Sequence, residues 1–480
     1  MSVVGTPGYH ETSIGWIPSD WALGTVRCFV AGLEAGVSVN AVETDTGCSE
    51  DEIGVLKTSA VLRGKFFPKQ HKVIVSADIH RAATKVKSDR IIISRMNTPA
   101  LVGESGYVPN AHSNLFLPDR LWQTIPSDIP HSQRWLSYWL QLPATRRLLS
   151  AGSSGTSGSM KNISKDTLLS LPTPLTPLPE QLKIAAILTT VDDKLDVIAL
   201  QIANTQTLKQ GLMQTLFSRG VGIQDAKGRW VPHAEFRESA FGAIPESWKE
   251  TTLGVICAGA LKTGPFGSQL HAAEYQEEGV PVLMPKDLID GRANIATAAR
   301  ISKERATDLA KHKLVKGDLL FSRRGDVARF ALIDEKSEGA LCGTGCLKAR
   351  LTSEHSPAFF SHLLQLDTVR AWLEQNAVGQ TMPNMNTSIL SSLPLIAPTS
   401  LDEEQEIADI LDCVDAKMRL LLAKQSNYQS LKRGLMQKLL TGEWRVKSGT
   451  LVSEILATDL TVNNVKLPTK ADFSLMAEAI

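Results

Sequence analysis

Two long stretches of this chain place apolar residues at steps of three and four. In the first, residues 178–220, the apolar stripe consists of Ile184, Ile187, Val191, Leu195, Ile198, Ile202, Leu208, Leu212 and Leu216. In the second, residues 401–443, it consists of Ile407, Ile410, Val414, Met418, Leu421, Tyr428, Leu431, Leu435 and Leu439, with Gln425 interrupting it. The steps average about 3.5 residues, which is the period of a coiled-coil seam. The pattern therefore predicts two long amphipathic helices.

The two stretches repeat each other. They align without a gap at an offset of 223 residues, and 18 of 43 positions are identical. A repeat of this length indicates a duplicated architecture. A helix of ~38 residues is a rod of ~57 Å that cannot bury its apolar stripe alone. We expect the two helices to pair as a coiled coil; the alternative is that each helix packs on its own domain.

A glycine stands at the same place in both predicted helices. Gly211 and Gly434 lie in matching sequence contexts, and neither helix contains an internal proline. Glycine inside a helix costs ~1 kcal/mol relative to alanine. The repeated glycine therefore indicates either the close approach of another backbone or a break near the helix end.

The duplication extends to the edges of the segments that precede the helices. Residues 11–21 and 238–248 share the pattern Gly-x-Ile-Pro-x-x-Trp, and residues 160–172 resemble residues 382–394. The roughly 150 residues between these edges show little further identity. Two domains with common edges and different middles are expected to share a scaffold and to recognise different ligands.

The middles carry short strand-like and helix-like runs, which indicate mixed α/β domains. The strand-like runs are residues 72–75, 90–94, 280–284, 318–321 and 328–333, the helix-like runs are 133–149 and 358–376, and the expected loops are 152–159 and 376–386. The predicted fold class is α+β, with two such domains separated by two long antiparallel coiled-coil helices in a pseudo-twofold arrangement. The predicted parts are a first domain at 9–175, a first helix at 176–222, a linker and second domain at 223–398, a second helix at 399–445 and a tail at 446–480.

The overall composition only narrows the classes of protein to which this chain could belong. The 480 residues include 51 basic and 50 acidic side chains, a net charge of +1, so any nucleic-acid surface is local. The N-terminus has no signal-peptide pattern, and no run of 18 apolar residues predicts a membrane span. Six irregularly spaced cysteines favour a reducing cytoplasm. We expect a cytoplasmic protein without membrane contact.

Motifs for catalysis are missing from the sequence. There is no phosphate-binding Gly-x-x-x-x-Gly-Lys-Ser/Thr motif and no Gly-x-Gly-x-x-Gly motif after a strand. Asp119 with Asp192 and Asp193 resembles a nuclease carboxylate set only superficially, because the second part lies in the apolar stripe. Cys342 and Cys346 form one close pair, whereas zinc sites need about four ligands; we interpret them as buried thiols. The sequence predicts no catalytic residue, metal site or cofactor in this chain.

Basic residues gather in both middles, which fits phosphate contacts and the reading of guanine edges. The alternative is that they are ordinary solvated charges. The candidate DNA-binding residues are Arg63, Lys65, Arg95 and Asn97 in the first domain and Gln269, Lys286, Arg323 and Arg324 in the second.

The order of these motifs resembles the specificity (S) subunit of Type I restriction–modification systems. The motifs are Gly-x-Ile-Pro-x-x-Trp twice, Pro-Leu-Pro-Glu-Gln before the first helix, Leu-Lys-x-Gly-Leu-Met-Gln-x-Leu near both helix ends, Thr263-Gly-Pro-Phe-Gly-Ser268, and Lys316-Gly-Asp-Leu-Leu-Phe-Ser-Arg323 with a looser version at residues 86–95. The resemblance covers about residues 9–445. It departs from the pattern at the start of the second helix, 401–405, and in the tail after Trp444.

The resemblance implies a division of labour. Each domain would be a target recognition domain that reads one half of a split sequence in double-stranded DNA. The helices would set the spacer and hold two methyltransferase subunits; restriction and translocation subunits would complete the enzyme. S-adenosylmethionine, ATP and magnesium would belong to these partners. The candidate docking residues are Leu208, Leu212, Leu216, Leu431, Leu435 and Leu439.

Two other functions and one packing prediction remain to be tested. The same fold could serve another restriction class with a single fused nuclease–methyltransferase partner, or the chain could be a coiled-coil adaptor that binds proteins. If the duplication is structural, residues 9–21 should pack beside the second helix as residues 236–248 follow the first.

Overall fold

The computed structural model describes residues 7–43, 52–155, 160–265, 267, 269–379 and 383–446. Parts of the predicted segments lie outside the described residues: 156–159 of the loop expected at 152–159, 380–382 of the loop expected at 376–386, Phe266 and Ser268 of the Thr263–Ser268 motif, and the tail from 447 onward. The chain forms two compact units. Unit 1 comprises residues 1–197 and 425–480, and unit 2 comprises residues 198–424.

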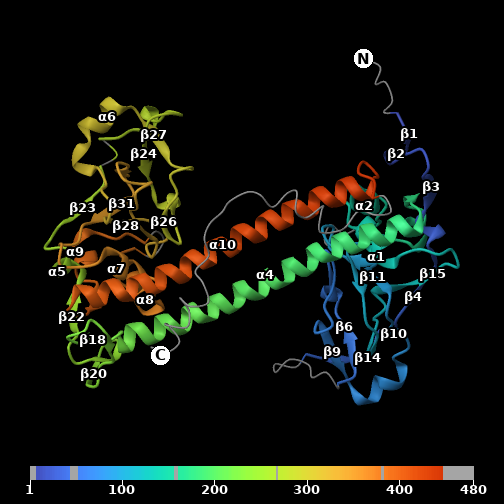
Figure 1. Cartoon of the computed structure of the whole chain (residues 1–480), viewed down its shortest axis with the longest axis horizontal. Helices are drawn as coiled ribbons and strands as arrows, with labels where there is room; N and C mark the ends of the chain where they lie inside the picture. The colour runs from blue at the N-terminus through green and yellow to red at the C-terminus, as the bar shows by residue number, and fades with distance from the viewer. Residues whose placement is uncertain are drawn as a thin grey trace. The chain divides into compact units, whose positions relative to one another are not determined.

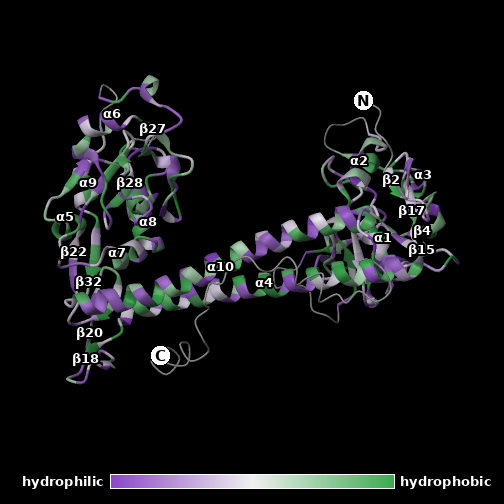
Figure 2. Cartoon of the chain, turned by 45° about the horizontal axis from the view of Figure 1, so that its top comes forward, coloured by the Kyte–Doolittle hydropathy of each residue, from purple (hydrophilic) through white to green (hydrophobic). Residues whose placement is uncertain are grey.

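Both predicted long helices are confirmed. α4 spans Leu178–Arg219, 42 residues, and α10 spans Leu401–Leu440, 40 residues. Hydrophobic and hydrophilic residues alternate along both helices (Figure 2). Each unit contains one part of α4 and one part of α10, and within each unit these parts lie side by side (Figure 1).

The contacts inside each unit make the two helices antiparallel. In unit 1, Ile184 and Val191 near the start of α4 share a core with Leu435 and Leu439 near the end of α10. In unit 2, Leu216 near the end of α4 shares a core with residues near the start of α10, Ile407, Ala408 and Leu411. The same cores contain domain residues, so each helix pairs with the other and also packs on the domains.

The domain of unit 1 is built on two sheets. The six-stranded sheet has the order β4 (Val30–Ala35), β15 (Leu121–Pro126), β11 (Arg90–Ser94), β13 (Ser105–Val108), β8 (Gly64–Phe66) and β7 (Val61–Leu62). The five-stranded sheet has the order β10 (Lys85–Val86), β14 (His112–Phe116), β6 (Gly54–Leu56), β9 (His71–Ile74) and β5 (Ala41–Val42). β9 and β11 confirm the strands expected at 72–75 and 90–94.

The helix expected at 133–149 is two helices, α1 (Gln133–Leu140) and α2 (Pro143–Ala151). Ser132 caps α1 by accepting the N–H of Trp135. Pro143 occupies the first turn of α2, where a missing N–H costs nothing, and its preceding residue is extended. A proline inside a helical pattern therefore ended one helix and began the next.

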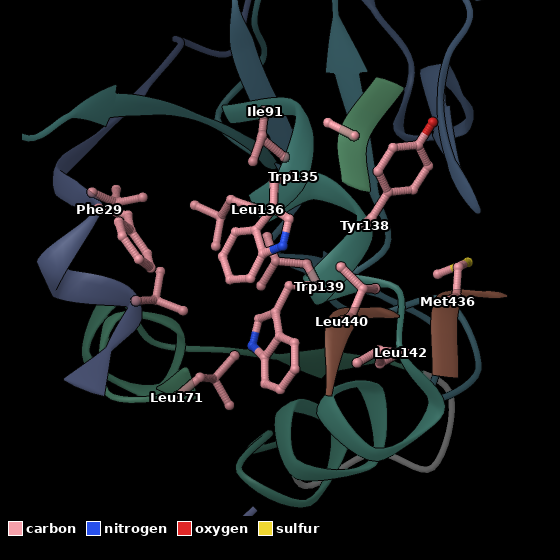
Figure 3. Close-up of a cluster of buried hydrophobic side chains, with 14 of the residues drawn as sticks. Phe29, Ile91, Trp135, Leu136, Tyr138, Trp139, Leu142, Leu171, Met436 and Leu440 are labelled. Carbon is pink, nitrogen blue, oxygen red and sulfur yellow. The ribbon is translucent and has the colours of Figure 1, made fainter. Parts of the chain in front are cut away.

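The core of unit 1 joins α1 to the long helices (Figure 3). Trp135 and Trp139, one helical turn apart, are stacked with ring centroids 6.2 Å apart. Trp135 is fully buried, and Met436 and Leu440 of α10 belong to the same cluster. Burying an aromatic side chain stabilises a fold by about 3 kcal/mol, so this cluster is a main attachment of the domain to α10.

The domain of unit 2 repeats this plan, with fewer strands in its second sheet. Its six-stranded sheet has the order β23 (Leu261–Thr263), β31 (Cys346–Ala349), β28 (Leu319–Ser322), β29 (Phe330–Leu332), β26 (Gly291–Ala293) and β25 (Leu288–Ile289). A three-stranded sheet has the order β27 (Ala299–Ile301), β24 (Val280–Leu283) and β30 (Leu341–Cys342). β24, β28 and β29 confirm the three strands expected here, and the run 358–376 is again split, into α7 (Pro357–Leu363) and α8 (Asp367–Asn376).

The repeated sequence edges fold alike in the two units. The hairpin of β1 (Tyr9–Thr12) and β2 (Gly15–Pro18) has the register of β20 (Phe236–Ser239) and β21 (Gly242–Pro245), with Tyr9 opposite Pro18 and Phe236 opposite Pro245. β3 (Ala22–Thr25) pairs with β17 (Pro172–Leu175), as β22 (Lys249–Thr252) pairs with β32 (Pro394–Ala397). The shared scaffold inferred from the sequence is thus present at both domain edges.

The break that was one explanation for the repeated glycine is wrong, and the described chain itself supplies no close backbone. α4 continues past Gly211 to Arg219, and α10 continues past Gly434 to Leu440, so neither helix breaks there. A Cβ placed on either glycine would meet nothing within 4 Å, so no other part of the described chain approaches closely. Both glycines lie on the exposed side of their helix.

Candidate nucleic-acid interface

The basic candidates of unit 1 lie at opposite ends of the central strand β11. Lys65 on β8 pairs in register with Tyr107, which is opposite Ile91 near the start of β11. Arg95 directly follows the end of β11. The structure therefore does not bring Lys65 and Arg95 together, although the sequence analysis placed them in one group.

Of the two candidates near the start of β11, Arg63 and Lys65, one already has its charge neutralised. The Lys65 ammonium forms an ion pair with Asp196 of α4. Arg63 is exposed, adopts a positive φ of 49°, and donates its backbone N–H to Glu104. Of these two side chains, Arg63 is the one whose charge faces solvent without a described ion pair.

Arg95 and Asn97 lie where β11 ends. Arg95 is half-buried, its guanidinium carbon lies 5.7 Å from the centre of the Trp122 ring, and its Nε is enclosed without a hydrogen-bond partner among the described residues. Asn97 on β12 (Met96–Asn97) donates to the Ser94 hydroxyl at 3.3 Å and accepts the Thr98 N–H at 2.9 Å. The Asn97 amide thus shapes its own turn.

Arg323 holds the equivalent place in unit 2. It directly follows β28, is half-buried, and its Nε is likewise enclosed without a described partner. Its neighbour Arg324 is exposed. Lys286 is exposed in the turn Pro285–Asp287, while Gln269 is half-buried and accepts the Arg305 guanidinium at its backbone carbonyl. The four candidates of unit 2 are therefore spread over three segments.

The same loop is fastened beside each of these arginines. The Arg95 carbonyl accepts the N–H of Ile163 at 3.0 Å, and the Arg323 carbonyl accepts the N–H of Met385 at 2.8 Å. A β-bridge closes each loop, between Ser154 and Asn162 in unit 1 and between Val378 and Asn384 in unit 2. The resemblance of residues 160–172 to 382–394 had marked both segments in the sequence, but it did not predict that each lies beside Arg95 or Arg323.

Equivalent arginines in two otherwise divergent domains suit a contact that does not depend on base sequence. Phosphate contacts position a protein on DNA, while base contacts distinguish one sequence from another. The geometry therefore separates Arg95 and Arg323, at equivalent places, from Arg63 and Lys286, at places that differ between the domains. Arg324 pairs with Asn384 as Met96 pairs with Asn162 in unit 1, so that place is shared and the residue differs.

A buried glutamate fixes the start of each long helix. Glu180 of α4 is 7% exposed and accepts the indole N–H of Trp21 at 3.2 Å. Glu403 of α10 is 3% exposed and accepts the indole N–H of Trp248 at 3.1 Å. Each tryptophan ends a Gly-x-Ile-Pro-x-x-Trp motif. The repeated motif therefore attaches the start of each long helix to the edge of a domain.

The segment after the other helix completes each of these sites. Arg445, after α10, pairs with both Glu180 and Asp20, while the backbone N–H groups of Val221 and Gly222, after α4, donate to Glu403. Tyr9 donates its hydroxyl to the Gly442 carbonyl at 2.9 Å. The prediction that residues 9–21 pack beside the second helix is confirmed.

The candidate docking leucines divide by burial. Leu216, Leu435 and Leu439 are buried in the cores of their own units, and Leu212 and Leu431 pack against those cores. Leu208 is 44% exposed. The six leucines were chosen because they lie on the apolar seam, and residues on a seam face the partner helix and the core. Leu208 is the only exposed one of the six, so it is the best placed of them to contact another subunit.

Three of the groups considered for catalysis, Asp192, Cys342 and Cys346, are buried in the fold. Asp192 is buried and accepts the Tyr138 hydroxyl at 2.8 Å. Cys342 and Cys346 are buried free thiols, and burial raises the pKa of the Cys342 thiol to about 12. Within the described ranges, no group of three or more His, Cys, Asp or Glu residues is placed to hold a metal ion. No helix among the described residues is long and apolar enough to cross a membrane.

Duplicated α/β domains seated on a shared pair of helices define a tandem recognition protein. The chain belongs to the Type I restriction–modification specificity family: the model of the "Type I restriction modification DNA specificity domain" matches residues 50–205 and 245–427, once in each module.

Relatives span nearly the whole chain. It is 24% identical over 443 residues to the putative Type I restriction enzyme MjaX specificity subunit of Methanocaldococcus jannaschii, covering 92% of this chain and 97% of the relative. It is also 24% identical over 319 residues to the MjaVIII specificity subunit of that organism, covering 65% and 71%. Its fold resembles the S subunit of a Type I system from M. genitalium, with a TM-score of 0.58, 18% identity, and 88% and 96% coverage.

Proposed function

We propose that this chain is the DNA-binding specificity subunit of a Type I restriction–modification complex. Each domain reads one half of a bipartite DNA sequence. The observation that carries the proposal is the contrast between the repeated helix seats and domain edges and the divergent domain middles, in a chain that belongs to the specificity family. One scaffold holding two different readers is what recognition of two different half-sites requires.

The contacts divide into two kinds in this proposal. Arg95 and Arg323, at the constant end of the central strand, contact phosphates. Arg63, Gln269 and Lys286, from segments that differ between the domains, are candidates for reading base edges. Asn97 and Arg324, which lie beside the equivalent arginines, are further candidates because the residue types there differ between the domains. Lys65 is a weaker candidate because Asp196 already neutralises it.

The long helices supply the spacer and the docking surface. Two methyltransferase subunits bind along them, and Leu208 offers one exposed apolar contact. Restriction and translocation subunits complete the assembly. S-adenosylmethionine, ATP and magnesium act in these partners, and this chain contributes recognition without catalysing a reaction itself. The complex works in the cytoplasm, where its DNA substrate is.

Filter binding against salt tests the proposal. The full chain is assayed with and without its methyltransferase subunits on duplex DNA. We expect log affinity to fall linearly with log salt, by ~0.9 per phosphate contact. A coiled-coil adaptor for proteins would give no salt-dependent DNA binding. Copurification distinguishes the other restriction class, because it would return one fused nuclease–methyltransferase instead of separate methyltransferase subunits.

A further inference from the structure

Two lysine–aspartate ion pairs connect α4 to α10, one in each unit. In unit 1, Lys432 Nζ of α10 lies 2.6 Å from Asp192 Oδ1 of α4. In unit 2, Lys209 Nζ of α4 lies 2.7 Å from Asp415 Oδ1 of α10. The lysines hold equivalent places in the sequence repeat, and so do the aspartates. Each helix thus gives one aspartate and one lysine.

The two pairs are related by the sequence repeat. Each joins the repeated lysine of one helix to the repeated aspartate of the other, and each fixes the antiparallel pairing of the helix segments within its own unit. Asp192 and Lys209 are 17 residues apart in the sequence, as are Asp415 and Lys432, so the repeat gives both helices the same spacing of charges.

Both pairs are shielded from water and held by the domains. The side chains of Lys209, Asp415 and Lys432 are 19% exposed and that of Asp192 is 7% exposed. In unit 1, Tyr138 of α1 donates its hydroxyl to Asp192. In unit 2, Lys209 donates to the Gln365 side chain at 2.9 Å. Each ion pair therefore joins α4, α10 and a recognition domain at one point.

An apolar seam alone specifies register weakly. Leucine and isoleucine at 3.5-residue spacing pack in several registers of similar energy, and a single polar residue in the seam can select one of them. A shielded ion pair selects register more strongly, because a slipped register leaves two charges buried without partners. Its role is then specificity of arrangement more than added stability.

We infer that Lys209–Asp415 and Lys432–Asp192 are positioning pairs that fix the helix register and thereby the spacer length accepted between the two half-sites. This inference rests on the proposed function, since a spacer exists only if each domain reads half of a bipartite site. The four residues contact no DNA; they act through the helices that carry the readers.

The test measures methylation of DNA with both half-sites fixed and the spacer varied. The full chain is expressed with its methyltransferase subunits, and spacers from two base pairs shorter to two longer than the natural one are compared. The double variant Lys209→Met with Lys432→Met removes both positive charges and keeps an unbranched side chain at each position. Asp192 would still contact Tyr138 and Arg134, and Asp415 would still lie beside His362. We expect its preference for the natural spacer over its neighbours to fall about tenfold, within the range of coupling between contacting charges.

Two controls separate register from general stability. Lys209→Arg with Lys432→Arg keeps both charges and should retain the wild-type spacer preference. Lys438→Met, on α10, removes an exposed ion pair with Glu443, which follows that helix, and should also retain the wild-type spacer preference. An unchanged preference in the double methionine variant, or an equal loss of methylation at every spacer, would overturn the inference while leaving the proposed function intact. Failure of the wild-type complex to methylate any bipartite site would instead refute the proposed function.

Discussion

At the residue scale, the most informative side chains are those that hold the same place in both units. Glu180 and Glu403 each receive a tryptophan N–H, and Arg95 and Arg323 each follow a central strand. The partners of the two glutamates differ in one respect. Glu180 pairs with Arg445, whereas Glu403 pairs with His233 at 2.8 Å. The tryptophan–glutamate hydrogen bond is the same in both units, whereas the basic side chain that contacts the glutamate differs.

The Glu403 carboxylate should contribute strongly to stability. Glu403→Ala would leave the Trp248 indole and the Val221 and Gly222 N–H groups without an acceptor in a buried place. We expect the free energy of unfolding to fall by about 3 kcal/mol, because each unsatisfied buried donor is costly. Urea unfolding measures this loss. Asp402→Ala, at the exposed neighbouring position, is the matched control and should cost less than about 1 kcal/mol.

Arg323 should contribute to DNA affinity without contributing to base preference. Arg323→Gln removes a half-buried guanidinium at the constant end of β28, so we expect weaker binding to all sequences and a salt slope reduced by about 1. Lys316→Gln, which loses an exposed pair with Glu335, should leave the slope unchanged. Relaxed preference at one base pair would reassign Arg323 as a base reader.

At the element scale, α4 and α10 show both the strength and the limit of sequence reasoning. Their apolar period identified both helices, because helical periodicity is a local signal that survives in the sequence. The matching glycines were misread, since propensity alone does not say which side of a helix a residue occupies. Glu403 with Trp248 and Arg95 with Ile163 join segments far apart in the chain, and such contacts have no periodic signature. Five strands were recognised, β9, β11, β24, β28 and β29, while most of the short strands of both domains were not. The places of the base-reading loops depend on tertiary contacts.

The exposed glycines give a direct prediction about helix stability. Gly211→Ala and Gly434→Ala place a methyl group in open space on a helix. Each should raise the free energy of unfolding by about 0.5–1 kcal/mol, because alanine loses less backbone freedom on folding. Denaturant unfolding of the full chain measures both. A loss of stability would mean that another backbone does approach these positions.

The segment that follows α10 should loosen in acid. The Arg445 guanidinium, hydrogen-bonded to Asp20, holds the pKa of that carboxyl below its usual value. A group with a lowered folded pKa stabilises the fold above its unfolded pKa of ~3.9 and loses that contribution as pH falls through the folded value. Asp20→Asn should therefore lower stability at neutral pH, and its difference from the wild type should vanish well below pH ~4. A difference that persists in strong acid would show that Asp20 acts by packing instead of charge.

At the scale of the whole molecule, the account rests on two modules with one scaffold and two readers. The helix starts, helix ends and domain edges repeat in detail, and each unit pairs the start of one helix with the end of the other. The sequence analysis anticipated this duplication because identical residues mark it. The bases that each domain reads do not follow from the duplication, because readers diverge where the scaffold repeats.

Methylation mapping of a genome that expresses this chain with its methyltransferase subunits would show which DNA sequence the two domains read. We expect one bipartite motif, with two different half-sites separated by an unread spacer of fixed length. Arg323→Gln should lower methylation without altering the motif. A continuous motif, two identical half-sites, or a spacer that varies freely in the wild type would refute the proposal that two different domains on one scaffold each read one half-site.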